Sequence, residues 1–161
     1  MLFRLLLVAL ALFASPALAQ QTDPWEVKDT PFGRAAVGST NVGPNAPAKS
    51  WNVLAVGLFC GDRKVGPRSI NLYLYGISDE RMRKGAVEAI VNVDGTVHPF
   101  RLQHINDAVV TTVSPEFVRA FIKAKAVSVL VKDYESPNPD TINMDKAAAA
   151  IPLALRPCFK P

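Results

Sequence analysis

The alternation of hydrophobic and polar positions is clearest between Ser114 and Tyr134, where it changes from helical to strand spacing. Ser114, Pro115 and Glu116 are typical of a helix start, with a capping oxygen, a proline at the first helical position and an acid in the first turn. Apolar side chains then recur at helical spacing: Phe117, Val118, Phe121 and Ile122. Valines alternate after Ala126, which is strand spacing. The pattern predicts a helix at about 115–125 with a buried aromatic face, followed directly by a strand.

Period-two alternation predicts further strands: Trp51–Cys60, Ile70–Tyr75, Val87–Val93, Thr96–Leu102 and Ala108–Val113. The first is apolar on both faces, which is typical of a central strand covered on each side. Asp94-Gly95 predicts a tight hairpin turn. Because Pro99 has no N–H to donate to a ladder, its strand is expected at a sheet edge or at a bulge.

The remaining segments have weaker patterns. We interpret residues 20–50 as an N-terminal arm and linker, in which Phe32–Val37 forms a short edge strand and the glycine- and proline-rich remainder is loop. Residues 78–85 are polar enough for an exposed turn. Near the C-terminus a short strand is expected at 141–144, and Asp145 is expected to cap a second helix, at about 145–152, that stops near Pro152.

Together these elements predict an α+β, β-rich fold: an antiparallel β-sandwich or half-barrel with two helices packed on it. Residues 51–161 are expected to form a single β-rich domain, on which the arm packs.

The first nineteen residues have the features of a signal peptide. Arg4 supplies the positive charge, Leu5 to Phe13 forms an apolar run, and Ala17-Leu18-Ala19 supplies small residues for cleavage before Gln20. The apolar run is far shorter than the roughly 20 residues that span a bilayer. No second run of that kind follows, so we expect a soluble periplasmic or secreted protein with no membrane span in the mature chain.

Composition agrees with export. The chain has 161 residues and two cysteines, Cys60 and Cys158, which are expected to form a disulfide in an oxidising compartment. Its 18 basic and 14 acidic residues give a net charge of +4, which falls by one when Arg4 is removed. This net positive charge is smaller than that of a typical nucleic-acid-binding protein, and we expect no nucleic-acid partner.

The sequence contains no convincing set of catalytic or metal-binding residues. Residues 76–80 begin like a nucleophile elbow but lack the closing glycine. His98 and His104 are not at the spacing of a metal-binding helical pair, and each is interpreted as an ordinary half-exposed histidine. Three acids near a proline-rich loop lack the glycine turn of a calcium site: Asp133, Glu135 and Asp140. We therefore expect no catalytic residues, no metal and no cofactor.

Two basic clusters flank the strand Ile70–Tyr75: Arg63, Lys64 and Arg68 before it, and Arg81, Arg83 and Lys84 after it. Their simplest role is solubility. The alternative is that they bind an envelope protein or an anionic envelope polymer, and they are the candidate partner-binding residues of the chain.

The order of features resembles a known group of proteins. The leader is followed by Trp-x-Val, a strand ending in Leu58-Phe59-Cys60, the Val93-Asp94-Gly95 hairpin, Ser-Pro-Glu-Phe-Val from Ser114, and a close on Leu155-Arg156-Pro157-Cys158. This layout is similar to that of the small periplasmic β-sandwich proteins grouped with type VI secretion-associated TagO proteins and invasion-associated locus B proteins. The resemblance implies a non-enzymatic envelope accessory protein and supplies no site residues.

The sequence therefore predicts an exported, soluble, non-enzymatic accessory or binding protein of the cell envelope. The alternative is a small periplasmic hydrolase whose site has no recognisable motif.

Overall fold

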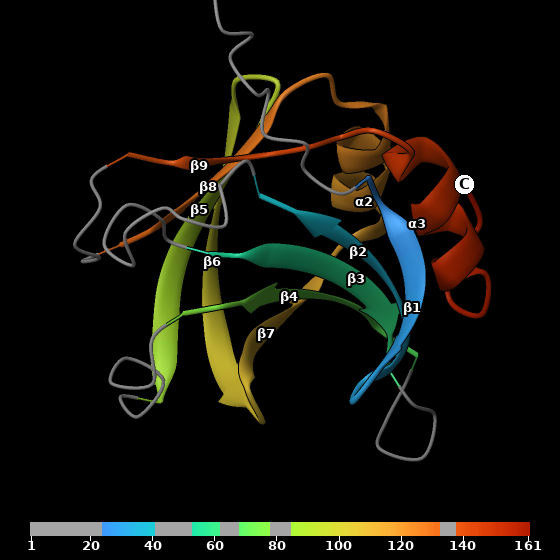
Figure 1. The fold of residues 1–161 in the computed structure, drawn as a ribbon, viewed down its shortest axis with the longest axis horizontal. Helices are drawn as coiled ribbons and strands as arrows, with labels where there is room; N and C mark the ends of the chain where they lie inside the picture. The colour runs from blue at the N-terminus through green and yellow to red at the C-terminus, as the bar shows by residue number, and fades with distance from the viewer. Residues whose placement is uncertain (1–23, 41–52, 62–67, 78–84, 133–137) are drawn as a thin grey trace, which may run out of the picture.

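The computed structural model describes residues 24–40, 53–61, 68–77, 85–132 and 138–161. They form one nine-stranded antiparallel sheet with two helices (Figure 1). The order of strands across the sheet is β1-β2-β3-β4-β7-β6-β5-β8-β9. This arrangement confirms the predicted α+β, β-rich class. The predicted leader at 1–19, and all but the last residue of the turn predicted at 78–85, lie outside the described residues.

The strands have the following bounds: β1 Glu26–Thr30, β2 Gly33–Ser39, β3 Ala55–Cys60, β4 Ile70–Tyr75, β5 Ala86–Val93, β6 Thr96–Ile105, β7 Ala108–Val113, β8 Val127–Val131 and β9 Asp140–Ile142. The helices are α2 Pro115–Lys123 and α3 Ala147–Leu155. Helix α3 packs beside β1, β2 and β3 and contacts α2 (Figure 1).

The sheet curves until its two ends meet. Thr40, directly after β2, forms a bridge with Ile142 of β9, and the N–H of Asn143 donates to the carbonyl of Ser39 over 3.2 Å. The Asp140 carboxylate, which is buried, accepts a hydrogen bond of 2.7 Å from the N–H of Val53. These bonds hold the curved sheet together at the seam, and the enclosed space becomes the main core.

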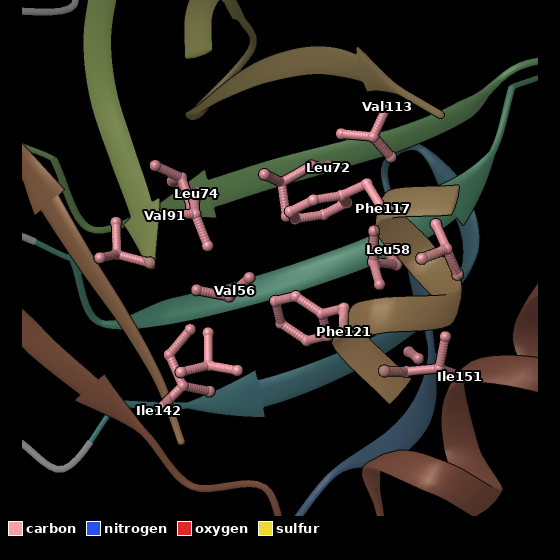
Figure 2. Packing of buried hydrophobic residues seen from close by; sticks show 14 of the residues in the cluster. Val56, Leu58, Leu72, Leu74, Val91, Val113, Phe117, Phe121, Ile142 and Ile151 are labelled. Carbon is pink, nitrogen blue, oxygen red and sulfur yellow. The ribbon is translucent and has the colours of Figure 1, made fainter. Parts of the chain in front are cut away.

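Helix α2 fills this enclosed space with aromatic side chains. Phe117, Val118 and Phe121 are buried among inward-facing residues of the sheet, including Val56, Leu58 and Leu72 (Figure 2). The Ser114 hydroxyl accepts from the N–H of Phe117 over 3.1 Å, which satisfies an N–H that the helix itself leaves free. The predicted helix, its cap and its buried face are confirmed.

The Asp94-Gly95 hairpin is also confirmed, and it has a second role. Both residues have positive φ, 48° and 90°, as a turn of this kind requires. The Asp94 carboxylate also accepts from the N–H groups of Lys125 and Ala126, over 3.0 and 2.8 Å. One turn therefore closes the β5–β6 hairpin and fixes the connection from α2 to β8.

The second helix differs from the prediction. It starts at Ala147, and the residue before it, Lys146, has left-handed backbone angles and gives no side-chain cap, so Asp145 is not the cap. The helix also continues through Pro152 to Leu155 instead of stopping there. Proline removes one helical hydrogen bond, but Ile151, Ala154 and Leu155 are all buried in the main core, and their packing offsets that loss.

The N-terminal arm contributes more to the sheet than predicted. The edge strand predicted at Phe32–Val37 is instead β2, which lies inside the sheet because β1 pairs along its outer side. Trp25 is buried in the main core, where its indole N–H donates to the carbonyl of Asn143 over 2.7 Å. The arm is therefore an integral part of the core.

Three strand boundaries also differ. Strand β3 begins at Ala55, because Leu54 is exposed while Val53 and Val56 both face the core, and Trp51 lies outside the described residues. Strand β6 runs to Ile105, so that His104 lies in the strand and not in the loop after it. Strand β9 is one residue shorter than the strand expected at 141–144 and begins one residue earlier.

Pro99 lies in the part of β6 that pairs with β5 but not with β7, so β6 is locally an edge of the sheet there. A proline, which has no N–H to donate, is tolerated at such an edge.

Candidate functional site

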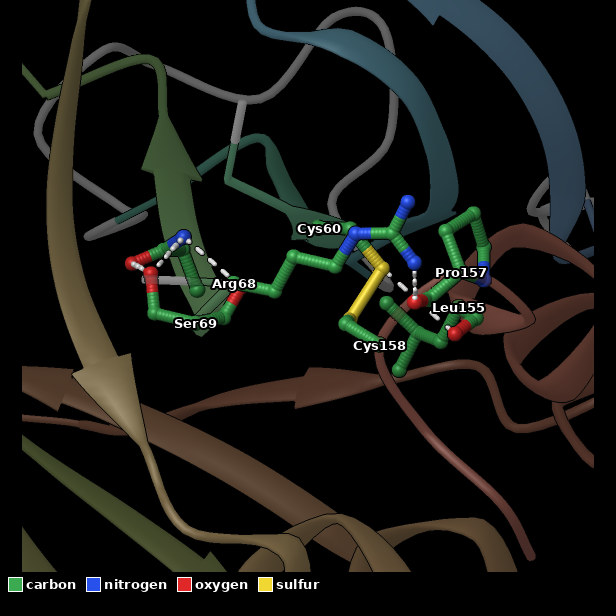
Figure 3. Close-up of a disulfide and its surroundings, with 7 residues drawn as sticks. Cys60, Arg68, Ser69, Leu155, Pro157 and Cys158 are labelled. Atoms are coloured by element: carbon green, nitrogen blue, oxygen red, sulfur yellow. Dashed lines mark hydrogen bonds between the residues drawn. A yellow bond between two sulfur atoms is a disulfide. The ribbon is translucent and has the colours of Figure 1, made fainter. Parts of the chain in front are cut away.

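The predicted disulfide is present and ties the C-terminal tail to the sheet. Cys60, the last residue of β3, is bridged to Cys158, and their Cα atoms are 5.8 Å apart (Figure 3). The bridged sulfur of Cys60 has no hydrogen, so its 3.4 Å approach to the Leu155 carbonyl is a contact without a hydrogen bond. The bridge brings the end of α3 beside the segment that enters β4.

An open hollow of about 390 Å³ lies beside this disulfide. Three arginines line it together with the bridged cysteine and small or apolar residues: Arg34, Arg68, Arg156, Cys60, Gly61, Leu153, Ala154 and Pro157. Each arginine is exposed, and each comes from a different part of the chain. Arg34 follows the turn into β2, Arg68 precedes β4, and Arg156 follows the last residue of α3.

Arg68 is held in place across the disulfide. Its guanidinium donates a hydrogen bond to the carbonyl oxygen of Pro157, next to the bridged Cys158 (Figure 3). A guanidinium carries five N–H donors, so this bond fixes the side chain and leaves the other donors available. The residue that follows, Ser69, is itself linked to Asn71 by side-chain hydrogen bonds of 3.1 to 3.4 Å.

The charged side chains that line the hollow are all basic. Its described lining contains three guanidinium groups and no carboxylate, and none of the three arginines forms an ion pair with another described residue. Asp29 is the nearest acid in sheet register, opposite Arg34. Unpaired guanidinium groups around one hollow attract carboxylate or phosphate, which they bind through paired N–H donors.

The structure groups the predicted basic residues differently from the sequence. Arg68 belongs to the hollow, whereas its predicted neighbours Arg63 and Lys64 lie outside the described residues. The second predicted cluster, Arg81, Arg83 and Lys84, also lies outside them. Arg34 and Arg156 were missed, because they are far from Arg68 in sequence. One signal was available: a bridge between Cys60 and Cys158 places Arg156 near the residues that follow β3.

The two histidines occupy unlike surroundings. His104 is exposed on β6. His98 is half-buried, with its ring 5.0 Å from that of Phe117 and 6.5 Å from that of Phe100. Its Nε2 is buried without a hydrogen-bond partner among the described residues. His98 therefore packs as an aromatic side chain of the core, with one polar atom left unsatisfied.

Replacing His98 with phenylalanine should stabilise the protein. The variant keeps a ring against Phe100 and Phe117 and removes the unpaired nitrogen, whose desolvation costs about 1–3 kcal/mol. We expect a gain of roughly 0.5–2 kcal/mol in the free energy of unfolding, measured by urea denaturation. His104→Phe, at an exposed position of the same strand, is the control and should change little. A clear loss of stability in His98→Phe would show that Nε2 has a partner.

Of the three acids near the proline-rich loop, Asp133 and Glu135 lie outside the described residues. Asp140 is buried and bonds to the backbone at the seam, a structural role. Among the described residues, no three histidines, cysteines or acids gather in a way that would hold a metal ion. No helix in the described part of the chain is long and apolar enough to cross a membrane.

Comparison with protein-family models, with curated proteins and with solved structures finds no match for this chain. The resemblance in layout to TagO and locus B proteins therefore stays a prediction.

Proposed function

We propose that this protein is an exported, non-enzymatic binding protein of the cell envelope, and that its arginine hollow binds the carboxylate or phosphate groups of an anionic envelope polymer. The observation that carries the proposal is the convergence of Arg34, Arg68 and Arg156 on one hollow whose described lining has no acid. Phosphate and carboxylate groups are the anions that guanidinium groups bind most specifically.

Two further observations support this assignment. The signal-peptide pattern and the Cys60–Cys158 disulfide are both typical of exported proteins. The disulfide and the Arg68 hydrogen bond join the segment that enters β4 to the end of α3, and β2 pairs with β3, so the backbone around the three arginines is organised before a ligand arrives. Preorganisation matters because it lowers the entropy that binding would otherwise lose.

The histidines favour binding over hydrolysis. The ring neighbours of His98 are phenylalanines, and His104 is exposed on the strand. A general base would need to lie within hydrogen-bond reach of the group that it activates.

The proposal predicts that the protein binds polyanions through the three arginines. Isothermal titration with a soluble oligophosphate and with polyglutamate should show binding that weakens as salt is added, because exposed charges are screened. Each single variant, Arg34→Gln, Arg68→Gln and Arg156→Gln, should lose about 1–2 kcal/mol of binding free energy, which is roughly 5–30-fold in affinity.

The matched control is Arg101→Gln, which removes an exposed arginine of β6 outside the hollow. It lowers the net charge equally, so a general electrostatic attraction would weaken by the same factor in all four variants. The proposal predicts less than a twofold change for the control. Equal losses in the control and in the hollow variants would refute a defined site.

A further inference from the structure

A second concave site lies on the outer face of the sheet. It is a cleft of about 360 Å³, in the size range of natural ligand pockets, which begins near 300 Å³. Its floor comes from β3, β4 and β7, and its two walls come from the β1–β2 hairpin and the β6–β7 turn. The lining residues are Lys28, Asp29, Thr30, Pro31, Phe32, Val37, Ala55, Tyr73, Tyr75, Asn106, Asp107 and Ala108. None of them lines the arginine hollow.

The floor of the cleft is built around two tyrosines. Tyr73 and Tyr75 are two residues apart on β4, so their side chains project from the same face. Tyr75 is paired with Ala55 on one side and with Ala108 on the other. Two alanines beside a tyrosine leave open space around its ring, and Tyr75 is 48% exposed. The exposed ring is therefore available as a flat apolar surface.

Tyr73 is fixed in position beneath the wall of the cleft. Its ring lies over Gly57, where an added Cβ would come within 2.0 Å of a ring carbon. It also contacts the rings of Phe32 and Phe59, with centroids 5.6 and 6.0 Å away, and these two rings stack on each other at 5.1 Å. This aromatic cluster forms a small second core on the outer face and makes the cleft rigid.

The hydroxyl of Tyr73 is accessible from the cleft. Tyr73 as a whole is only 6% exposed and its hydroxyl makes no hydrogen bond with any described residue, but the hydroxyl oxygen itself keeps contact with solvent. Burial raises the pKa of Tyr73 to about 12, so the group stays a neutral donor throughout the physiological range. A ligand in the cleft would accept a hydrogen bond from this hydroxyl in place of water.

The rim of the cleft is polar and carries both signs of charge. Lys28 lies on the hairpin wall, and Asn106 and Asp107 form the turn on the other side. The side chain of Asp29 projects from the opposite face of β1, the face of its register partner Arg34. Carboxylate and amide groups can accept from one hydroxyl of a ligand and, for the amide, donate to the next. The Asp107 carboxylate offsets the charge of Lys28, which also forms an ion pair with Glu26, so the rim does not favour an anion. A purely apolar ligand would leave Asn106, Asp107 and the Tyr73 hydroxyl without hydrogen bonds from the ligand.

We infer that this cleft binds a sugar ring of a neutral glycan. A pyranose has an apolar C–H face that fits against the exposed ring of Tyr75, and its edge carries neighbouring hydroxyls for Asn106, Asp107 and the Tyr73 hydroxyl. The site is separate from the arginine hollow and does not depend on it. A protein with both sites would bind the sugar rings of a glycan in the cleft and the anionic groups of a polymer in the arginine hollow.

The test is a titration of the full mature protein with chitotriose, cellotriose and maltotriose, followed by amide chemical shifts. At least one sugar should shift the amides of Tyr73, Tyr75, Asn106 and Asp107 at millimolar concentration. Tyr75→Ala should weaken that binding about tenfold or more, and Tyr75→Phe, which keeps the ring, should weaken it by less than about threefold. Tyr75 is half exposed, so both variants should fold, as circular dichroism will verify.

The arginine variants keep the two proposals apart. A variant with Arg34, Arg68 and Arg156 all changed to Gln should bind the sugar as tightly as the unaltered protein, whether or not it has lost polyanion binding. The inference is wrong if none of the three sugars shifts the cleft amides. It is also wrong if octanoate, an apolar chain, shifts them and the sugars do not.

Discussion

Removing the Cys60–Cys158 disulfide should cost about 4–5 kcal/mol of stability, because the bridge closes a loop across a sequence separation of 98 residues. In the chain-entropy model a loop of that length greatly restricts the unfolded chain. The double variant Cys60→Ser/Cys158→Ser should therefore melt on the order of 10–15 °C lower than the unaltered protein. Against a typical total stability of about 5–15 kcal/mol, this is a large share.

Reduction of the unaltered protein should reproduce this loss, and the double variant should not respond to reductant. Thiol labelling after unfolding without reductant should count no free cysteine. Leu155 and Phe159, on either side of Cys158, are both buried in the main core. If the loss stays below about 1 kcal/mol, those two side chains hold the tail without help from the bridge.

Phe121→Ala should be the most damaging single substitution in α2. Phe121 is fully buried in the main core (Figure 2). Its ring centroid lies 5.6 Å from those of Trp25 and Phe117. Truncating a buried phenylalanine removes its transfer free energy and leaves a cavity, at a cost of about 3–5 kcal/mol. Denaturant unfolding measures the change, and an unaltered slope would show that the folded state keeps its compactness.

Phe100→Ala is the matched control for this substitution. Phe100 also contacts Phe117, with centroids 5.1 Å apart, but it is only half-buried on β6. Its truncation should cost less than half as much as that of Phe121, since less apolar area returns to water. Equal costs for the two variants would mean that α2 does not fill the enclosed space as described.

The parts of the fold that local sequence determines were predictable. Ser114 caps α2, Asp94-Gly95 turns the β5–β6 hairpin, and the valines of β8 alternate, since each depends only on residues a few positions apart. The prediction that the second helix stops near Pro152 was wrong because it considered only local sequence. The local cost of the proline is outweighed by the burial of α3 against β1, β2 and β3, which come from distant parts of the chain.

The candidate sites were less predictable for the same reason. The arginine hollow joins residues from the start of β2, the entry to β4 and the end of α3, and only Arg68 belongs to the basic clusters that the sequence predicts. The outer cleft depends on alanines placed beside Tyr75 by strand register and on a glycine beneath Tyr73. The tyrosine-bearing face of β4 was visible in the sequence, but its neighbours were not.

The most direct test of the proposed function is to observe the arginine side chains themselves during a titration with oligophosphate. In a nitrogen–proton spectrum of the side-chain Nε–H groups, the signals of Arg34, Arg68 and Arg156 should shift together and saturate at one affinity. Those of Arg101 and Arg119, which lie outside the hollow, should stay in place. Equal shifts for all five arginines, or none for the three of the hollow, would contradict the proposal.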